Sequence, residues 1–114
     1  MQIQFSKPAI LDFRDVVMAM VPFVMHGGVT IVANNDDVFV TALTPNVDLK
    51  FRIPGETTTT TGSVTVCIFD LRDILKERTI RNAHKPPLTL ALAGETGIAL
   101  SMGKRSWQLD RLDV

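Results

Sequence analysis

A six-residue phrase that occurs twice constrains this chain most strongly. Residues 12–17 read D-F-R-D-V-V, and residues 70–75 read D-L-R-D-I-L. Both copies follow the pattern Asp-apolar-Arg-Asp-apolar-apolar. Each opens a helical run that follows one short alternating segment and precedes three more. The chain therefore reads as one unit written twice, with halves at residues 1–53 and 63–114.

The first half has the order strand, helix, strand, strand, strand. The expected segments are a strand at 2–5, a helix from Ser6 to Met20, and strands at 29–33, 38–43 and 47–53. Ser6 suits the N-cap of the helix, and Pro8 suits its first turn, where a missing N–H costs nothing. Strict alternation over 47–53 predicts an antiparallel strand with one wet face. Pro22 and then Gly27-Gly28 close the helical segment.

The second half repeats this order. The expected segments are a strand at 64–68, a helix at 70–81, and strands at 88–93, 98–102 and 106–112. The helix should bury Leu71, Ile74 and Leu75, which recur at helical spacing. The glycines of 94–97 and of Gly103-Lys104 supply the hairpin turns between the last strands.

Residues 54–62 link the halves and contain five successive threonines, Thr57 to Thr61. Threonine suits strands, but this run has no apolar face to bury, so we predict a mobile surface connection. Each half can form its own antiparallel sheet covered by its helix, with the two helices packed side by side. The sequence thus predicts one α+β domain, residues 1–114, with internal pseudo-symmetry.

Composition narrows the function classes. An apolar content of 46% is typical of a globular domain, and the twelve basic and twelve acidic residues cancel, which gives no support for a free monomer that grips nucleic acid strongly. The single cysteine, Cys67, cannot form an internal disulfide, which favours a cytoplasmic protein. No apolar run approaches the roughly 18 to 20 residues of a membrane span, so a membrane partner is not expected.

The sequence predicts no enzyme, metal site or cofactor. His26 and His84 are isolated, without a cysteine or second histidine at metal-ligand spacing. The serines at 63, 101 and 106 lack the strand-turn-helix context of a nucleophile. The glycines of 94–97 join two expected strands and do not precede a helix, so they form a turn and no phosphate cradle.

Three phrases carry a resemblance to a known family. They are V-F-V-T-A-L-T (38–44) leading to D-L-K-F (48–51), S-V-T-V-C-I-F-D-L-R-D-I-L (63–75), and L-A-G-E-T-G-I-A-L-S-M-G-K-R-S-W-Q-L (92–109). With the order of the segments, they resemble a single domain of the bacterial sliding clamp, the beta subunit of DNA polymerase III. The resemblance covers nearly the whole chain and rests on order and spacing.

This resemblance implies a DNA-clamp-like fold and a processivity factor. In that family the helices line a central hole and the sheets form a continuous outer wall. Family members carry three such domains per chain and close as dimers, so a ring of that size would need about six copies of this chain. The family's partner-binding groove lies toward its later domains and C-terminal tail, so no groove residue is carried over.

If the helices face DNA, their outward cations are the candidate contacts. These DNA-binding candidates are Lys7, Arg14, Arg72, Lys76, Arg78 and Arg81. Five of the twelve basic residues fall between 72 and 85, which favours the second helix as the electropositive element. A clamp that slides needs weak, sequence-blind contacts with the phosphates of duplex DNA. The same mixed charge is also compatible with an ordinary solvated helix face.

Two hypotheses for function follow. The first is a processivity-factor-like replication accessory that contacts duplex DNA and self-associates through sheet edges, because the last strand, with Trp107 and Leu109, has no proline to block its edge. The second is a clamp-derived interaction module that binds a replication protein or another clamp subunit without touching DNA. A third reading is one domain taken from a longer chain.

Overall fold

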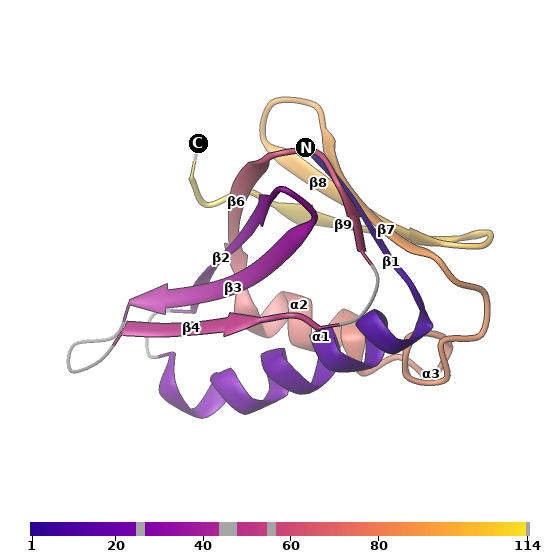
Figure 1. Ribbon diagram of the computed structural model, residues 1–114, viewed down its shortest axis with the longest axis horizontal. Helices are drawn as coiled ribbons and strands as arrows, with labels where there is room; N and C mark the ends of the chain where they lie inside the picture. Colours follow the sequence, from indigo (N-terminus) through magenta and orange to yellow (C-terminus); the bar gives the residue numbers. More distant parts are fainter. Residues whose placement is uncertain (25–26, 44–47, 55–56, 114) are drawn as a thin grey trace.

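Two antiparallel sheets meet above a layer of helices in the computed structural model (Figure 1), which describes residues 1–24, 27–43, 48–54 and 57–113. The strands are β1 (Gln2–Phe5), β2 (Gly28–Asn34), β3 (Asp37–Leu43), β4 (Asp48–Arg52), β5 (Thr57–Thr59), β6 (Gly62–Cys67), β7 (Leu88–Ala93), β8 (Gly97–Met102) and β9 (Arg105–Asp110). The helices are α1 (Lys7–Met20), the short 3-10 helix η1 (Val21–Phe23), α2 (Ile68–Leu75) and α3 (Arg78–Arg81).

The two halves exchange their first strands. Sheet A has the order β5-β1-β7-β8-β9, and sheet B has the order β4-β3-β2-β6. Thus β1 pairs with β7 of the second half, and β6 pairs with β2 of the first half. The predicted α+β fold with internal pseudo-symmetry is confirmed, but the prediction that each half forms its own sheet is wrong. Alternation identifies the buried face of a strand and does not identify the neighbouring strand.

Each helix packs its apolar face against the sheets and against the other helix. Ser6 is the N-cap residue of α1 and Pro8 lies in its first turn, as predicted. Phe13 on α1 is fully buried and stacks on Phe5 of β1, with 4.8 Å between the ring centroids. On α2 the buried residues include Leu71, Ile74 and Leu75, also as predicted.

The predicted helix over 70–81 is two helices. α2 begins at Ile68 and ends at Leu75, and the extended backbone of Glu77 (φ −59°, ψ 145°) separates it from α3. Ile80 lies nine residues beyond Leu71, so one continuous helix would place their side chains on opposite faces. The break turns Ile80 into the core, where it is fully buried.

Part of the predicted mobile connection is a strand. β5 pairs with β1, with Thr59 opposite Ile3. Its hydroxyls bind the turn between β2 and β3: Thr57 Oγ1 donates to the Asp36 carbonyl oxygen (2.9 Å), and the Asp36 N–H donates to Thr59 Oγ1 (3.1 Å). These hydrogen bonds fix the position of the threonine segment, which has no apolar face to bury. The connection predicted to be a mobile surface segment therefore contains a paired strand at residues 57–59.

Two of the four outer sheet edges are covered. The turn at Asp36 flanks β5, and the Leu112 N–H donates to the Thr65 carbonyl oxygen of β6 (2.8 Å). Beside that bond Arg111 donates to both carboxylate oxygens of Asp113 (3.1 Å each), which holds the pKa of Asp113 below its ordinary value. Within the described ranges, β4 and β9 are left without a strand on their outer side.

The alternating strand predicted over 47–53 corresponds to β4, an antiparallel strand whose apolar face is only partly covered. Leu49 is half-buried, and Phe51 is 37% exposed, although both alternate with polar residues as predicted. Val47 and the expected turn at 44–46 lie outside the described residues. In the part of the chain that the structure describes, no helix is long and apolar enough to cross a membrane.

Candidate nucleic-acid interface

The repeated phrase places two arginines in equivalent surroundings. Arg14 Nη1 lies 3.4 Å from Asp15 Oδ1, and Arg72 Nη2 lies 3.1 Å from Asp73 Oδ1. The two arginine side chains are similarly covered, 29% and 30% exposed. The Arg72 guanidinium also lies over the Phe69 ring, 5.3 Å from its centroid. Both arginines are therefore partly neutralised and held against the protein, which weakens any grip they exert on phosphate.

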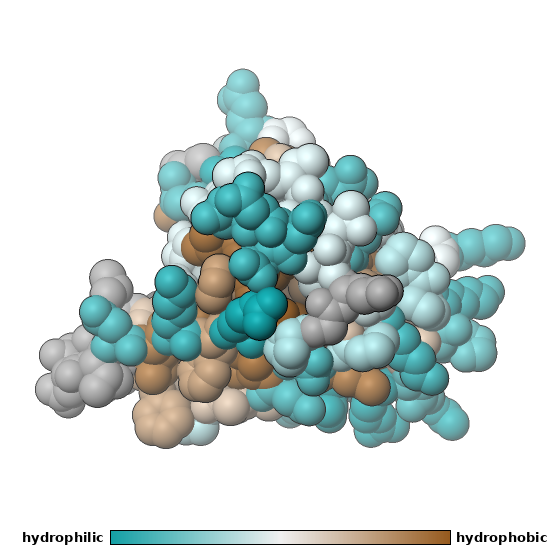
Figure 2. Space-filling view, in the orientation of Figure 1, coloured by the Kyte–Doolittle hydropathy of each residue, from teal (hydrophilic) through white to brown (hydrophobic). Residues whose placement is uncertain are grey.

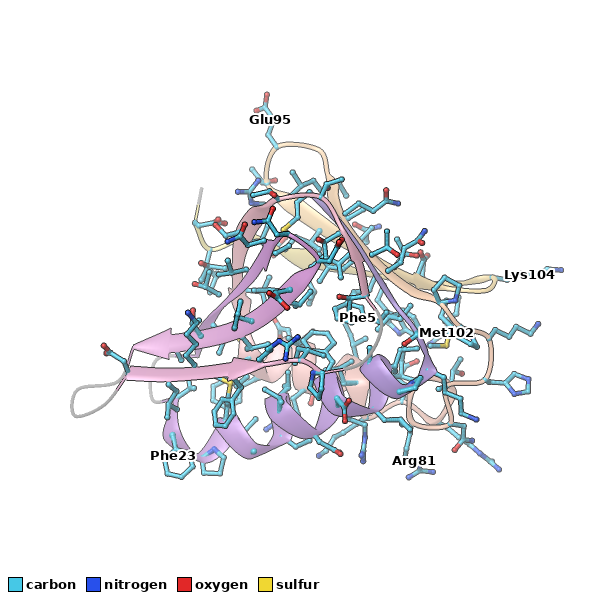
Figure 3. The ribbon with its side chains drawn as sticks, in the orientation of Figure 1. Phe5, Phe23, Arg81, Glu95, Met102 and Lys104 are labelled. Atoms are coloured by element: carbon cyan, nitrogen blue, oxygen red, sulfur yellow. The ribbon has the colours of Figure 1, made fainter. Side chains whose placement is uncertain are left out.

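The other predicted cations are more available. Lys7, Lys76, Arg78 and Arg81 are exposed, and the ion pairs among the described residues include none of them. Arg78 and Arg81 are three residues apart on α3 and so share a face. Figure 3 shows Arg81 pointing from the helical layer into solvent. Because α3 contacts α1, whose first residue is Lys7, these cations gather toward one end of the layer (Figure 1).

The opposite end of the helical layer is apolar. Phe23 in η1 is 58% exposed, and Met18 and Val21 beside it are half-buried. Apolar side chains gather over the C-terminal end of α1 and over β4 in Figure 2, where Figure 3 labels Phe23. Sequence reasoning missed this surface. The signal was Val21-Pro22-Phe23, because Pro22 ends the α-helical hydrogen bonding and leaves Phe23 beyond the buried stripe.

A third region of the layer is acidic. An open hollow of about 290 Å³ between α2 and β9 is lined by Asp70, Asp73, Ile74, Gln108, Leu109 and Asp110. Asp73 is paired with Arg72, and the carboxylates of Asp70 and Asp110 leave the hollow unfavourable for phosphate. No group of three or more metal-ligating residues is found in the described ranges.

The described residues weighed for catalysis come from several elements. His84 is exposed in the connection between α3 and β7, while His26 lies outside the described residues. Ser63 lies on β6, Ser101 on β8 and Ser106 on β9. Cys67 ends β6 and is half-buried. Ser101 and Ser106 are cross-strand partners on β8 and β9, whereas Ser63 lies in the other sheet.

Known structures with the same fold are bacterial sliding clamps. The beta clamp of Helicobacter pylori, solved with carprofen, superposes with a TM-score of 0.80 over 99% of this chain, at 18% sequence identity. The chain has the fold of one sliding-clamp domain. The DNA polymerase sliding clamp of Bacillus subtilis gives a TM-score of 0.73 over 98% of the chain, also at 18% identity.

The likeness to sliding clamps is one of fold and covers one part of each clamp. This chain spans 30% of the H. pylori clamp and 31% of the B. subtilis clamp. A further H. pylori beta clamp structure, bound to a DNA ligase peptide, has a TM-score of 0.79 and 19% identity over 99% of this chain and 31% of that one. No protein-family model matches the chain, and neither does any curated protein.

Proposed function

We propose that this chain is a sliding-clamp-like accessory of DNA replication, non-enzymatic and cytoplasmic, in which residues 1–114 act as one domain. The observation that carries the proposal is the clamp fold over 99% of the chain, with exposed cations at one end of its helical layer. The H. pylori and B. subtilis proteins that share this fold are clamps, the latter a DNA polymerase sliding clamp.

Duplex DNA is the proposed ligand of the helical layer. Lys7, Lys76, Arg78 and Arg81 supply the exposed charges for phosphate contact. Arg14 and Arg72, each paired with the next aspartate, contribute less. Contacts of this kind fix no base sequence, and a small number of them leaves the complex free to move along the duplex.

Self-association through β4 and β9 is the second part of the proposal. Among the described residues no strand pairs with the outer side of β4 or β9, and β4 adds the partly exposed apolar side chains of Leu49 and Phe51. An edge-to-edge contact of β4 with β9 is heterologous and closes only if the rotation between copies closes. The likeness to known clamps does not support the ring of about six copies expected from the sequence.

Light scattering on a sizing column, across a range of protein concentrations, tests the assembly. A discrete species larger than a dimer supports association through the two edges. A monomer at every concentration contradicts it.

Charge reversal tests the DNA contact. The double variant K76E/R78E should lose salt-dependent, length-tolerant binding to duplex DNA while its circular dichroism and urea midpoint stay close to those of the parent protein. Unchanged DNA affinity in this variant would exclude the helical layer as the contact surface.

An interaction module that binds a replication protein is the alternative function. The exposed Phe23, with the half-buried Met18 and Val21 beside it, favours this function, because a contiguous exposed apolar patch typically marks a protein contact. F23S should then abolish capture of the replication protein, whereas K76E/R78E should not. The reverse result favours the DNA-contacting accessory.

A further inference from the structure

We propose that the DNA-contacting surface continues past the helices to Lys104, in the turn between β8 and β9, and to Lys85, which packs on that turn. Both lysines contact backbone phosphates. This inference rests on the DNA contact proposed above and adds two residues that the helical layer does not contain. The basic end of the domain is defined here as Arg78, Arg81, Lys85, Lys104 and Arg105.

Lys85 packs against the turn between β8 and β9. Gly103 in that turn has φ +59°, and a Cβ atom built on it would lie 2.9 Å from Lys85 Cδ. The aliphatic stem of Lys85 therefore lies on the glycine, and its ammonium group is free to reach solvent, as both lysines are exposed. Lys104 follows Gly103 directly and projects from the tip of the turn in Figure 3.

An ion pair ties this turn to α3. Arg105 Nη2 donates to both carboxylate oxygens of Glu77, at 3.2 Å each, and Glu77 is the N-cap residue of α3. The Arg105 guanidinium also lies over the Trp107 ring, 5.6 Å from its centroid. Arg105 thus positions the turn against the helix that carries Arg78 and Arg81. Figure 3 shows Arg81 and Lys104 toward the same end of the molecule.

The basic end has a charge excess that the neutral chain hides. It is defined by five cations, and Glu77, the carboxylate that ties the turn to α3, is already paired with Arg105. Because the whole chain has a formal charge of zero, the remainder of the molecule is net negative. The acidic hollow lies at the other end of β9, which runs from Arg105 to Asp110, and against α2. Electrostatics therefore favours binding of a polyanion at the basic end over binding at the acidic hollow.

The chemistry of the basic end favours nucleic acid over an acidic protein. In the described part of the chain the exposed large apolar side chains are Phe23, Phe51, Leu92 and Leu112, none of which belongs to the basic end. Protein interfaces take most of their affinity from buried aromatic and apolar anchors, whereas phosphate contacts need only positive charge. Lysine ammonium groups on flexible stems suit loose, non-directional phosphate contacts.

The double variant K85Q/K104Q tests the inference. It removes two positive charges and keeps long polar side chains. The matched control is Q2E/T96E, which changes the net charge by the same amount. Both positions are exposed, Gln2 near the N-terminus and Thr96 next to Glu95, which Figure 3 shows away from the basic end. Fluorescence anisotropy of a short labelled duplex is followed over a series of salt concentrations. Urea denaturation of each variant verifies that it folds.

The expected result is a lower affinity for K85Q/K104Q and a slope of log affinity against log salt that is smaller by about 1.8, because each lost phosphate contact removes about 0.9. The control should keep the slope of the parent protein. Equal losses in both variants would show an effect of net charge alone and overturn the inference.

Failure of this inference is distinguishable from failure of the DNA contact itself. If the parent protein binds DNA, K76E/R78E loses binding and K85Q/K104Q matches the parent, then the contact is confined to the helices and only the extension is wrong. If the parent protein binds no duplex DNA even at low salt, then the proposed DNA contact and its extension both fail.

Discussion

The two halves of this molecule carry the same six-residue pattern in their helices and present different surfaces after it. In both, the phrase forms a helix in which an arginine pairs with the following aspartate. The first helix then continues to Met20 and ends beside the exposed ring of Phe23. The second breaks after Leu75 and restarts with Arg78 and Arg81. The repeat therefore determines the scaffold, and the residues that follow it determine what each half can bind.

The largest effect should come from the core position that the two phrases share. Phe13 and Leu71 occupy it, and both are fully buried. F13A should lower the free energy of unfolding by about 3–5 kcal/mol and L71A by about 2–5 kcal/mol, since each leaves a cavity. Urea denaturation measures both, and a single transition is expected because the halves share their sheets. Separate transitions for the halves would contradict this.

The second prediction compares cations of the two halves in DNA binding. R81Q should weaken duplex binding and reduce the salt slope by about 0.9, the value for one phosphate contact. R14Q should leave the slope unchanged, because Asp15 already compensates Arg14. Anisotropy titrations at several salt concentrations measure the slopes. A larger loss in R14Q than in R81Q would show that Arg14 contacts phosphate in spite of its pairing with Asp15.

Most of the scaffold and part of the candidate site could be predicted from the sequence. The order of segments, the start of α1 and the buried positions of α2 follow from local periodicity and capping. The strand exchange does not, because β1 has the same alternating pattern whichever strand it pairs with. The helix break was readable, since Ile80 is half a turn out of phase with Leu71. Lys85 was counted with the cations of the second half, but its contact with the turn that carries Lys104 could not be read from the sequence, because it depends on how a distant hairpin folds.

The third prediction separates the two arginines of the phrase by stability. R72A should cost about 0.5–1 kcal/mol more than R14A, because Arg72 also stacks on the Phe69 ring. The ion pairs themselves are partly exposed and should contribute at most about 1 kcal/mol each. Thermal or urea unfolding of the two variants measures the difference. Equal costs would show that the ring contact adds nothing.

The smallest predicted effect is a pH dependence at the second half's covered edge. The folded-state pKa of Asp113 is lowered by Arg111, so the pair stabilises the fold above the ordinary pKa of 3.8, and this contribution is lost as pH falls through the lowered value. D113N should therefore be slightly less stable than the parent protein at neutral pH, and the difference should vanish in acid. Urea midpoints over a pH series measure it, and a pH-independent difference would contradict the role of the pair.

The exchange of β1 and β6 bears on what a half of this domain could do alone. A chain with only one half would carry a strand whose place is in the other half's sheet, and would leave a gap in its own. Two such chains could complete both sheets only by trading strands, at a cost that depends on their concentration. The connection from β4 to β6 turns that encounter into an intramolecular step with a high effective concentration. Assembly of the domain is thereby independent of dilution.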